Sequence, residues 1–123
     1  MARLIKIKQY EDLRGCLTVI QDEIPFEIKR VFFIEGATRY ERGGHRHKTT
    51  RQALVCISGT CTISNDNGMV KKDYVLDSSG KCLILECEDW HTMHSFTSHA
   101  ILLVLASTTY TKNDYIDEPY LHD

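Results

Sequence analysis

Short β-prone segments separated by turn-forming residues are the feature that most restricts the fold of this 123-residue chain. They are rich in β-branched, aromatic and other apolar residues, and they cover residues 17–21, 28–34, 53–58, 61–65, 70–76, 82–86, 91–96 and 100–106. Many short strands at close spacing are typical of a β-sandwich or barrel. The sequence therefore predicts an all-β fold in one domain that spans residues 1–123.

The turn between two of these segments is the best-defined local feature. Asn65-Asp66-Asn67-Gly68 supplies residues that tolerate a positive φ, so we predict a hairpin centred on Asp66 to Gly68. After the last segment we expect only a turn or short helix over residues 113–121, which Pro119 interrupts.

Composition excludes several classes of protein. The net charge is -2 and the 15 Lys and Arg residues are spread along the chain, so we expect neither nucleic-acid nor membrane binding. The first eight residues lack an apolar signal core, and no segment approaches the roughly 20 apolar residues of a membrane span, which predicts a cytoplasmic protein. The five cysteines show no C-x-x-C spacing, so we expect buried free thiols.

The segment Ile101–Ala106 is apolar on both faces. We expect one face to pack on the opposite sheet and the other to be covered by a second subunit, which predicts a homodimer. The alternative is that this segment simply crosses the centre of one sandwich.

Two histidines stand in the most informative motif, Gly43-Gly44-His45-Arg46-His47, which is followed by Gln52. Residues i and i+2 of a strand project to the same side, so both imidazoles should share one face. The spacing His-x-His-x4-Gln-x6-Gly resembles the first cupin motif, and His91 stands in a stretch that resembles the second. Gln52 replaces the usual anionic ligand, which predicts a pocket used for acid/base chemistry and not for a metal.

Further segments resemble the dTDP-sugar 3,4-ketoisomerases. They cover residues 24–34, 42–48 with Gln52, 102–107 with Tyr110, and 114–116. The resemblance implies a cupin-type jelly roll, or double-stranded β-helix, that needs no cofactor or metal and dimerises by exchanging N-terminal strands. It also implies an isomerase that moves the carbonyl of dTDP-4-keto-6-deoxy-D-glucose from C4 to C3. Such products lead to 3-amino-3,6-dideoxy sugars for bacterial lipopolysaccharide O-antigens and other surface glycans.

One departure from this family concerns Phe32 and Phe33. Members commonly have tyrosine in the matching segment, so any role of a phenol must be absent here or met elsewhere.

Proton transfer between C3 and C4 calls for groups that titrate near neutral pH, which imidazoles do. Following the family, we expect His45 to be the base at C3 and His47 its partner, although the sequence leaves that division open. The candidate groups for binding the enediolate, sugar and diphosphate are the basic, amide and aromatic residues Arg30, Arg42, Lys48, Arg51, Gln52, Trp90 and His91.

Other interpretations stay open at this stage. His45, His47 and His91 could hold a metal in a three-histidine cupin enzyme. The chain could instead be a sugar-nucleotide 3,5-epimerase or a non-catalytic cupin that binds a sugar nucleotide. The configuration of the product at C4 and the identity of the nucleotide are not encoded in any spacing that we can identify.

Overall fold

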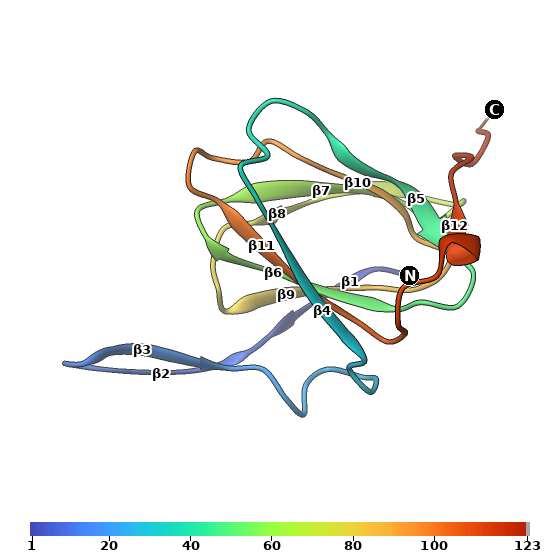
Figure 1. Cartoon of the computed structure of the whole chain (residues 1–123). Helices are drawn as coiled ribbons and strands as arrows, with labels where there is room; N and C mark the ends of the chain where they lie inside the picture. Colours follow the sequence, from blue (N-terminus) through green and yellow to red (C-terminus); the bar gives the residue numbers. More distant parts are fainter. Residues whose placement is uncertain (123) are drawn as a thin grey trace.

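Two five-stranded β-sheets face one another in the computed structural model, which describes residues 1–122 (Figure 1). The first sheet has the order β1 (Arg3–Lys6), β9 (Lys81–Leu85), β6 (Gln52–Ser58), β11 (Ile101–Ala106) and β4 (Arg30–Glu35). The second has the order β12 (Tyr115–Ile116), β5 (Arg42–His47), β10 (Trp90–His94), β7 (Cys61–Asp66) and β8 (Lys71–Leu76). All paired strands are antiparallel, and the predicted all-β sandwich is confirmed.

The main apolar core fills the space between the two sheets. Alternation along the strands directs Leu54 and Leu102 of the first sheet and Ile63 and Met93 of the second into one buried cluster. Burial of such side chains is the dominant favourable contribution to folding, so this cluster holds the two sheets together.

A second apolar cluster lies on the outer face of the first sheet. Ile7 and Ile24 from the N-terminal part of the chain pack there against residues such as Val55 and Leu105. The prediction that both faces of Ile101–Ala106 are covered is thus confirmed, because Leu102 faces the main core and Leu105 faces this second cluster. The chain itself supplies much of the outer cover, and the homodimer stays a prediction.

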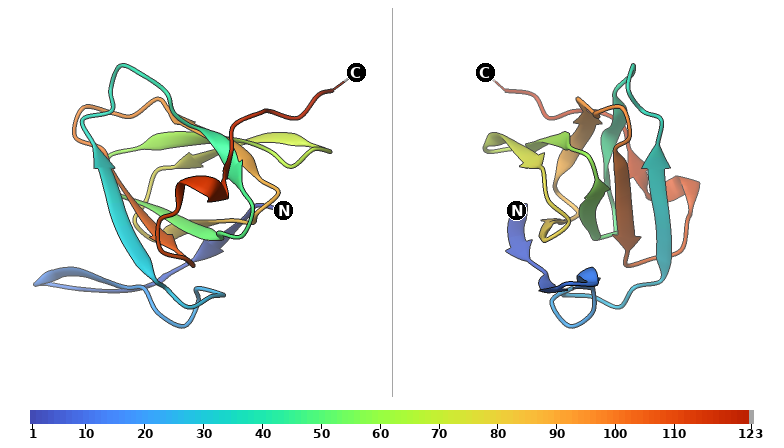
Figure 2. Two further views of the ribbon diagram at one scale, coloured as in Figure 1. Left: turned by 45° about the vertical axis from the view of Figure 1, so that its right-hand side comes forward. Right: turned by 90° about the vertical axis from the view of Figure 1, so that its left-hand side faces the viewer.

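The N-terminal hairpin projects away from the sandwich (Figures 1 and 2). It consists of β2 (Lys8–Asp12) and β3 (Gly15–Val19), and its exposed apolar side chains include Leu13 and Leu17. The prediction of buried thiols is wrong for Cys16, which is exposed on this hairpin, whereas Cys56, Cys61 and Cys82 are buried and Cys87 is partly buried. A projecting two-stranded ribbon has no core of its own in which to bury a thiol.

The predicted turn at Asp66 to Gly68 is confirmed. β7 and β8 pair antiparallel across it, and the Asp66 carboxylate accepts a hydrogen bond from the Gly68 backbone at 2.9 Å. Gly68 has a φ of +93°, a conformation that glycine adopts without steric cost.

The turn or short helix predicted over residues 113–121 is confirmed only at its start. Only a 3₁₀ turn, η1 (Lys112–Asp114), forms, and the chain then extends as β12 beside β5. The backbone groups of this segment find their hydrogen-bond partners in the strand that contains His47, so they do not need a helix to be satisfied. Within residues 1–122, no helix has the length and apolar character needed to cross a bilayer.

Candidate active site

Three histidines meet at one end of the space between the sheets. His45 lies opposite His91 in the β5–β10 ladder, and His47 follows on the same face of β5. The ring centroid of His45 lies 5.1 Å from that of His47 and 5.3 Å from that of His91. The i, i+2 spacing in a strand therefore produces the predicted histidine cluster.

A glycine pair brings β5 close to β10 at this point. Gly43 and Gly44 have φ angles of 82° and 80°, and the register shifts beside them. A Cβ on Gly43 would lie 2.9 Å from the carbonyl oxygen of His91, so a larger residue would push the strands apart. These glycines allow a bulge that sets the spacing of the histidines.

His47 is held by a buried carboxylate. Its Nδ1 lies 2.7 Å from Oδ2 of Asp114, and both side chains are buried. Burial lowers the pKa of His47 below its usual value, and the hydrogen bond and charge of Asp114 oppose that shift. The other ring nitrogen, Nε2, is buried without a hydrogen-bond partner.

His91 is fully buried and neutral. Burial lowers its pKa to about 3, against a smaller opposing effect of its backbone hydrogen bond. Its Nδ1 lies 3.0 Å from the carbonyl oxygen of Asp89, and because a carbonyl only accepts, Nδ1 carries the proton. Its Nε2 is therefore a free acceptor, and it too is buried without a partner.

His45 lies nearer the opening of the pocket, beside Tyr115. Burial lowers its pKa to about 4, and the neighbouring His47 contributes to the shift. The ring of Tyr115 lies 4.6 Å from that of His45 and 4.7 Å from that of His47, measured between centroids. A phenol is thus supplied from β12, although the segment with Phe32 and Phe33 has none.

Gln52 and Arg30 add polar groups from the first sheet. Gln52 is buried, and its Oε1 has no hydrogen-bond partner. The guanidinium of Arg30 lies 5.5 Å from the Phe32 ring centroid and 5.8 Å from that of Tyr110, while its Nε is buried without a partner. These groups leave hydrogen-bonding capacity for a polar, anionic ligand.

Lys48 lies at the rim of this end of the sandwich. With Tyr110, Lys112, Asn113, Tyr115 and Asp117 it lines an open cavity of about 470 Å³. Two ammonium groups and two aromatic rings form a suitable surface for a nucleoside diphosphate.

The structure does not bring three of the predicted residues to the histidines. The Arg51 guanidinium pairs with Glu86 at 2.6 Å and donates to the Pro25 carbonyl at 2.8 Å, because Arg51 points to the opposite face from its neighbour Gln52. Trp90 likewise points away from the face of its neighbour His91, and its indole donates to the Asp117 carbonyl.

Arg42 is the third of these residues. It lies at the start of β5 and lines a separate surface cavity of about 280 Å³ with residues 35–37 and 39–41. The bulge at Gly43 and Gly44 separates it from His45, and its role in substrate binding stays a prediction.

Asp114, Tyr115 and Tyr110 lie beside the histidines but were not among the predicted site residues; the sequence allowed Asp114 and Tyr115 either to close over the pocket or to anchor the tail. The sequence marks these positions only as part of a segment that resembles the ketoisomerases. Asp114 and Tyr115 contact β5, and Tyr110 packs on Tyr115, which joins residues far apart in the chain that local spacing cannot bring together. Within residues 1–122, no three His, Cys, Asp or Glu side chains are grouped as a metal would require.

The fold and the site define a cupin-type jelly roll with a histidine-lined pocket. The chain belongs to the sugar 3,4-ketoisomerase family described as FdtA, WxcM-like, C-terminal, whose model matches residues 1–121. The predicted resemblance is thus confirmed.

Similar proteins come from several bacteria. The chain is 40% identical over 117 residues to the TDP-4-oxo-6-deoxy-alpha-D-glucose-3,4-oxoisomerase of Aneurinibacillus thermoaerophilus, covering 93% of this chain and 84% of that protein. A 3,4-ketoisomerase structure from Helicobacter canadensis has a TM-score of 0.89 at 34% identity, covering 95% of this chain and 90% of that one.

A variant of the 3,4-ketoisomerase QdtA from Thermoanaerobacterium thermosaccharolyticum, solved with TDP-4-keto-6-deoxyglucose, has a TM-score of 0.90 at 36% identity. The match covers 95% of this chain and 87% of that one.

Proposed function

We propose that this chain is an isomerase that moves the carbonyl of a dTDP-linked 4-keto-6-deoxy sugar from C4 to C3. The observation that carries this proposal is the buried Nε2 of His47, which has no protein partner and lies in a pocket with two further imidazoles. The similar proteins support the substrate, since one was solved with TDP-4-keto-6-deoxyglucose and another is named as an oxoisomerase of the same sugar.

The reaction requires two proton movements. A base removes the proton on C3, which gives an enediolate with its charge on the oxygen of C4, and an acid then delivers a proton to C4. Meanwhile the hydroxyl proton on the oxygen of C3 moves to the oxygen of C4, so that C3 becomes the carbonyl. Atoms and electrons balance without any oxidant, and a positioned acid or base contributes about 10² to 10⁴ in rate.

We assign the carbon-bound proton to His47, which reverses the division expected from the sequence. His47 has a free buried Nε2 and a carboxylate behind its other nitrogen, whereas within residues 1–122 the His45 ring has a hydrogen bond only with the Gly43 backbone. His45 and Tyr115 lie against each other near the opening, and they move the proton between the two oxygens.

Gln52, His91 and Arg30 bind the reacting sugar in this proposal. The amide of Gln52 donates to the enediolate oxygen, and the free Nε2 of His91 accepts a hydrogen bond from a sugar hydroxyl. Arg30 offsets the developing negative charge, and Lys48 and Lys112 meet the diphosphate in the adjoining cavity.

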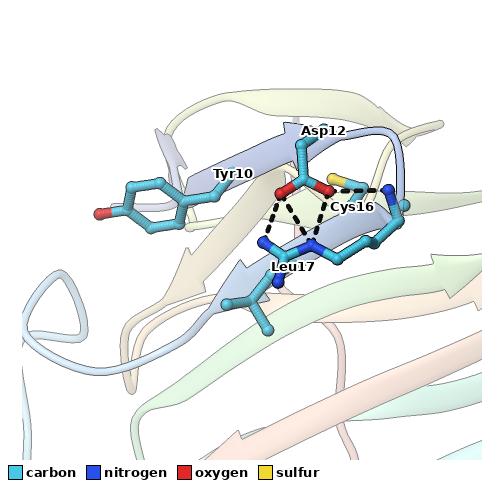
Figure 3. A pocket seen from close by; sticks show the side chains of 6 residues that line it. Tyr10, Asp12, Cys16 and Leu17 are labelled. Carbon is cyan, nitrogen blue, oxygen red and sulfur yellow. Dashed lines mark hydrogen bonds and ion pairs between the residues drawn. The ribbon is translucent and has the colours of Figure 1, made fainter.

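We further propose a homodimer built on the N-terminal hairpin and the exposed edge of the first sheet. Val31 and Phe33 of β4 are more than half exposed, at 58% and 60%, and the hairpin adds Leu13 and Leu17. The hairpin also forms a cavity of about 340 Å³ lined by residues that include Tyr10, Arg14 and Cys16 (Figure 3).

Sedimentation of Phe33→Glu tests the dimer. We expect the wild-type chain to sediment as a dimer and the variant as a monomer, because a charge would be buried in an apolar interface. A wild-type monomer at micromolar concentration would contradict the proposal.

The new ketone at C3 suits a later amination by a PLP-dependent aminotransferase. We therefore propose a place in the biosynthesis of 3-amino-3,6-dideoxy sugars for bacterial surface glycans. Location in the cytoplasm stays a prediction from the sequence.

Proton NMR in D₂O tests the proposed reaction. The EDTA-treated chain is mixed with dTDP-4-keto-6-deoxyglucose, and we expect a 3-keto sugar with deuterium at C4. Deuterium at C3 and C5 with the ketone still at C4 would indicate an epimerase. An unchanged spectrum would indicate a binding protein, and activity that appears only after Fe(II) or Mn(II) is added would indicate a metal enzyme.

A further inference from the structure

We propose that Asp114 is a positioning residue that fixes the tautomer and orientation of His47 for proton transfer at the sugar. This inference rests on the proposed ketoisomerase function of the same pocket. It assigns a task to η1 and β12, the segment in which the sequence predicted only a turn or short helix.

Backbone pairing holds Asp114 in place. Tyr115 of β12 pairs with His47 of β5, and the Lys48 backbone donates to the Asp114 carbonyl at 2.8 Å. These bonds on both sides of the Asp114 side chain align its carboxylate with the His47 ring. The Oδ2–Nδ1 distance of 2.7 Å is typical of a charge-assisted hydrogen bond.

Every partner of the Asp114 carboxylate can donate a proton. Oδ1 accepts from the backbone and the hydroxyl of Thr49 at 2.8 and 2.9 Å, and Oδ2 accepts from the Thr50 hydroxyl at 2.5 Å. Burial raises the pKa of Asp114, but these hydrogen bonds lower it by more, so that its pKa lies well below the usual value. The carboxylate is therefore ionised near neutral pH and can only accept.

An acceptor at Nδ1 determines which nitrogen of His47 carries the proton. Nδ1 must be protonated, so the lone pair lies on Nε2, the atom that is buried without a partner. When Nε2 takes the proton from C3, the resulting imidazolium lies beside the Asp114 carboxylate and is stabilised by it. The same Nε2–H can then deliver a proton to C4, which restores the neutral ring.

Asp114→Asn exchanges the donor and the acceptor in the hydrogen bond with His47, with little change in side-chain volume. The Thr49 backbone N–H is a fixed donor, so the amide oxygen must take the Oδ1 position and the NH₂ group the Oδ2 position. The NH₂ group would then donate to Nδ1 of His47, which moves the ring proton to Nε2. Nε2 of His47 then carries a proton and cannot accept another, while the fold is unchanged.

Kinetics and histidine ¹⁵N NMR of Asp114→Asn test the proposal. We expect kcat to fall about 10²- to 10⁴-fold with KM nearly unchanged, as for loss of the orienting acid in other carboxylate–histidine pairs. The ¹⁵N shifts of His47 should show a protonated Nδ1 in the wild type and a protonated Nε2 in the variant. Glu118→Gln, which removes a charge from an exposed position in the same segment, should keep the wild-type rate and tautomer.

A variant with wild-type kcat, or a wild-type His47 protonated at Nε2, would overturn the positioning role. The wild-type NMR reading decides this even where Asp114→Asn fails to fold, and it does not depend on turnover. Absence of turnover by the wild type would overturn the ketoisomerase function itself, which keeps the two failures distinct.

Discussion

The two ends of the space between the sheets are built on the same strands but differ in what fills them. Along β10, His91 and Met93 project to the same side, and along β6 Gln52 and Leu54 do so. Met93 and Leu54 join the apolar core, whereas His91 and Gln52 lie at the end with the other histidines. Two residues further along the same face of a strand, the surroundings of a side chain thus change from an apolar core to a cluster of polar groups.

This difference separates stability from chemistry. The apolar end gains free energy by removing its side chains from water. The polar end leaves Nε2 of His47, Nε2 of His91 and Oε1 of Gln52 buried without partners, and each such atom costs about 1–3 kcal/mol. Atoms that destabilise the folded chain in this way fit a site that is completed by a substrate.

The largest effect is expected for His47→Asn. Loss of the proposed base should lower kcat about 10²- to 10⁴-fold. The thermal midpoint should fall less than for a truncation in the apolar core, because loss of the hydrogen bond from Nδ1 to Asp114 is partly offset by removal of the Nε2 atom that lacks a partner. Met93→Leu, a change of similar volume at the apolar end of β10, serves as the control and should keep kcat.

Leu102→Ala should have the opposite profile. Leu102 is fully buried in the main core, so its truncation should lower the free energy of unfolding by about 2–5 kcal/mol in a urea titration. The kcat of the folded fraction should stay close to that of the wild type. A destabilisation below about 1 kcal/mol would contradict the assignment of this end to stability.

The pH dependence of stability distinguishes the two ends further. His91 has a folded-state pKa of about 3, and its unfolded-state pKa is about 6.5. The unfolded chain therefore binds the extra proton first, and the contribution of neutral His91 is present above pH 6.5 and is lost as pH falls toward 3. The slope from this group is about 1.4 kcal/mol per pH unit.

Urea titrations of His91→Gln from pH 7 to pH 4 check this slope. The variant should have a smaller slope than the wild type. His45 and His47 also have lowered pKa values and contribute in the same direction, so the difference isolates the share of His91. Asp114 contributes only at lower pH, because its pKa is lowered from the usual value of a carboxyl. Equal slopes would contradict a neutral, buried His91.

Gln52→Leu should have the smallest effect on stability, and it should stabilise the folded chain where Leu102→Ala destabilises it. Removal of an amide whose oxygen has no partner should raise the free energy of unfolding by about 1 kcal/mol. The kcat should fall, because the proposed donor to the enediolate is lost. Lower stability would show that the amide is satisfied in the folded chain.

Local rules predicted much of the fold. Apolar patterning and turn residues placed β4, the strands from β6 to β11 and the hairpin at Asp66 to Gly68, and the histidine motif placed β5. The strand β1 was not predicted because Arg3 and Lys6 interrupt its apolar pattern, and its pairing with β9 is non-local. The strand β12 was not predicted either, because its pairing with β5 is also non-local.

The site was partly predictable for the same reason. His45 and His47 follow from strand period alone, whereas Asp114 comes within hydrogen-bonding distance only through the β12–β5 pairing. Strand period could also have excluded Trp90 and Arg51, since each precedes an inward-facing residue and so points to the opposite face.

Release of deuterium from C3 tests the account most directly. The substrate labelled with deuterium at C3 is incubated with the wild-type chain, His47→Asn and Met93→Leu, and the label that enters water is measured. The wild type and Met93→Leu should release the label at similar rates, and His47→Asn should release it at least about 10²-fold more slowly. Equally fast release by His47→Asn would contradict the assignment of the chemistry to His47.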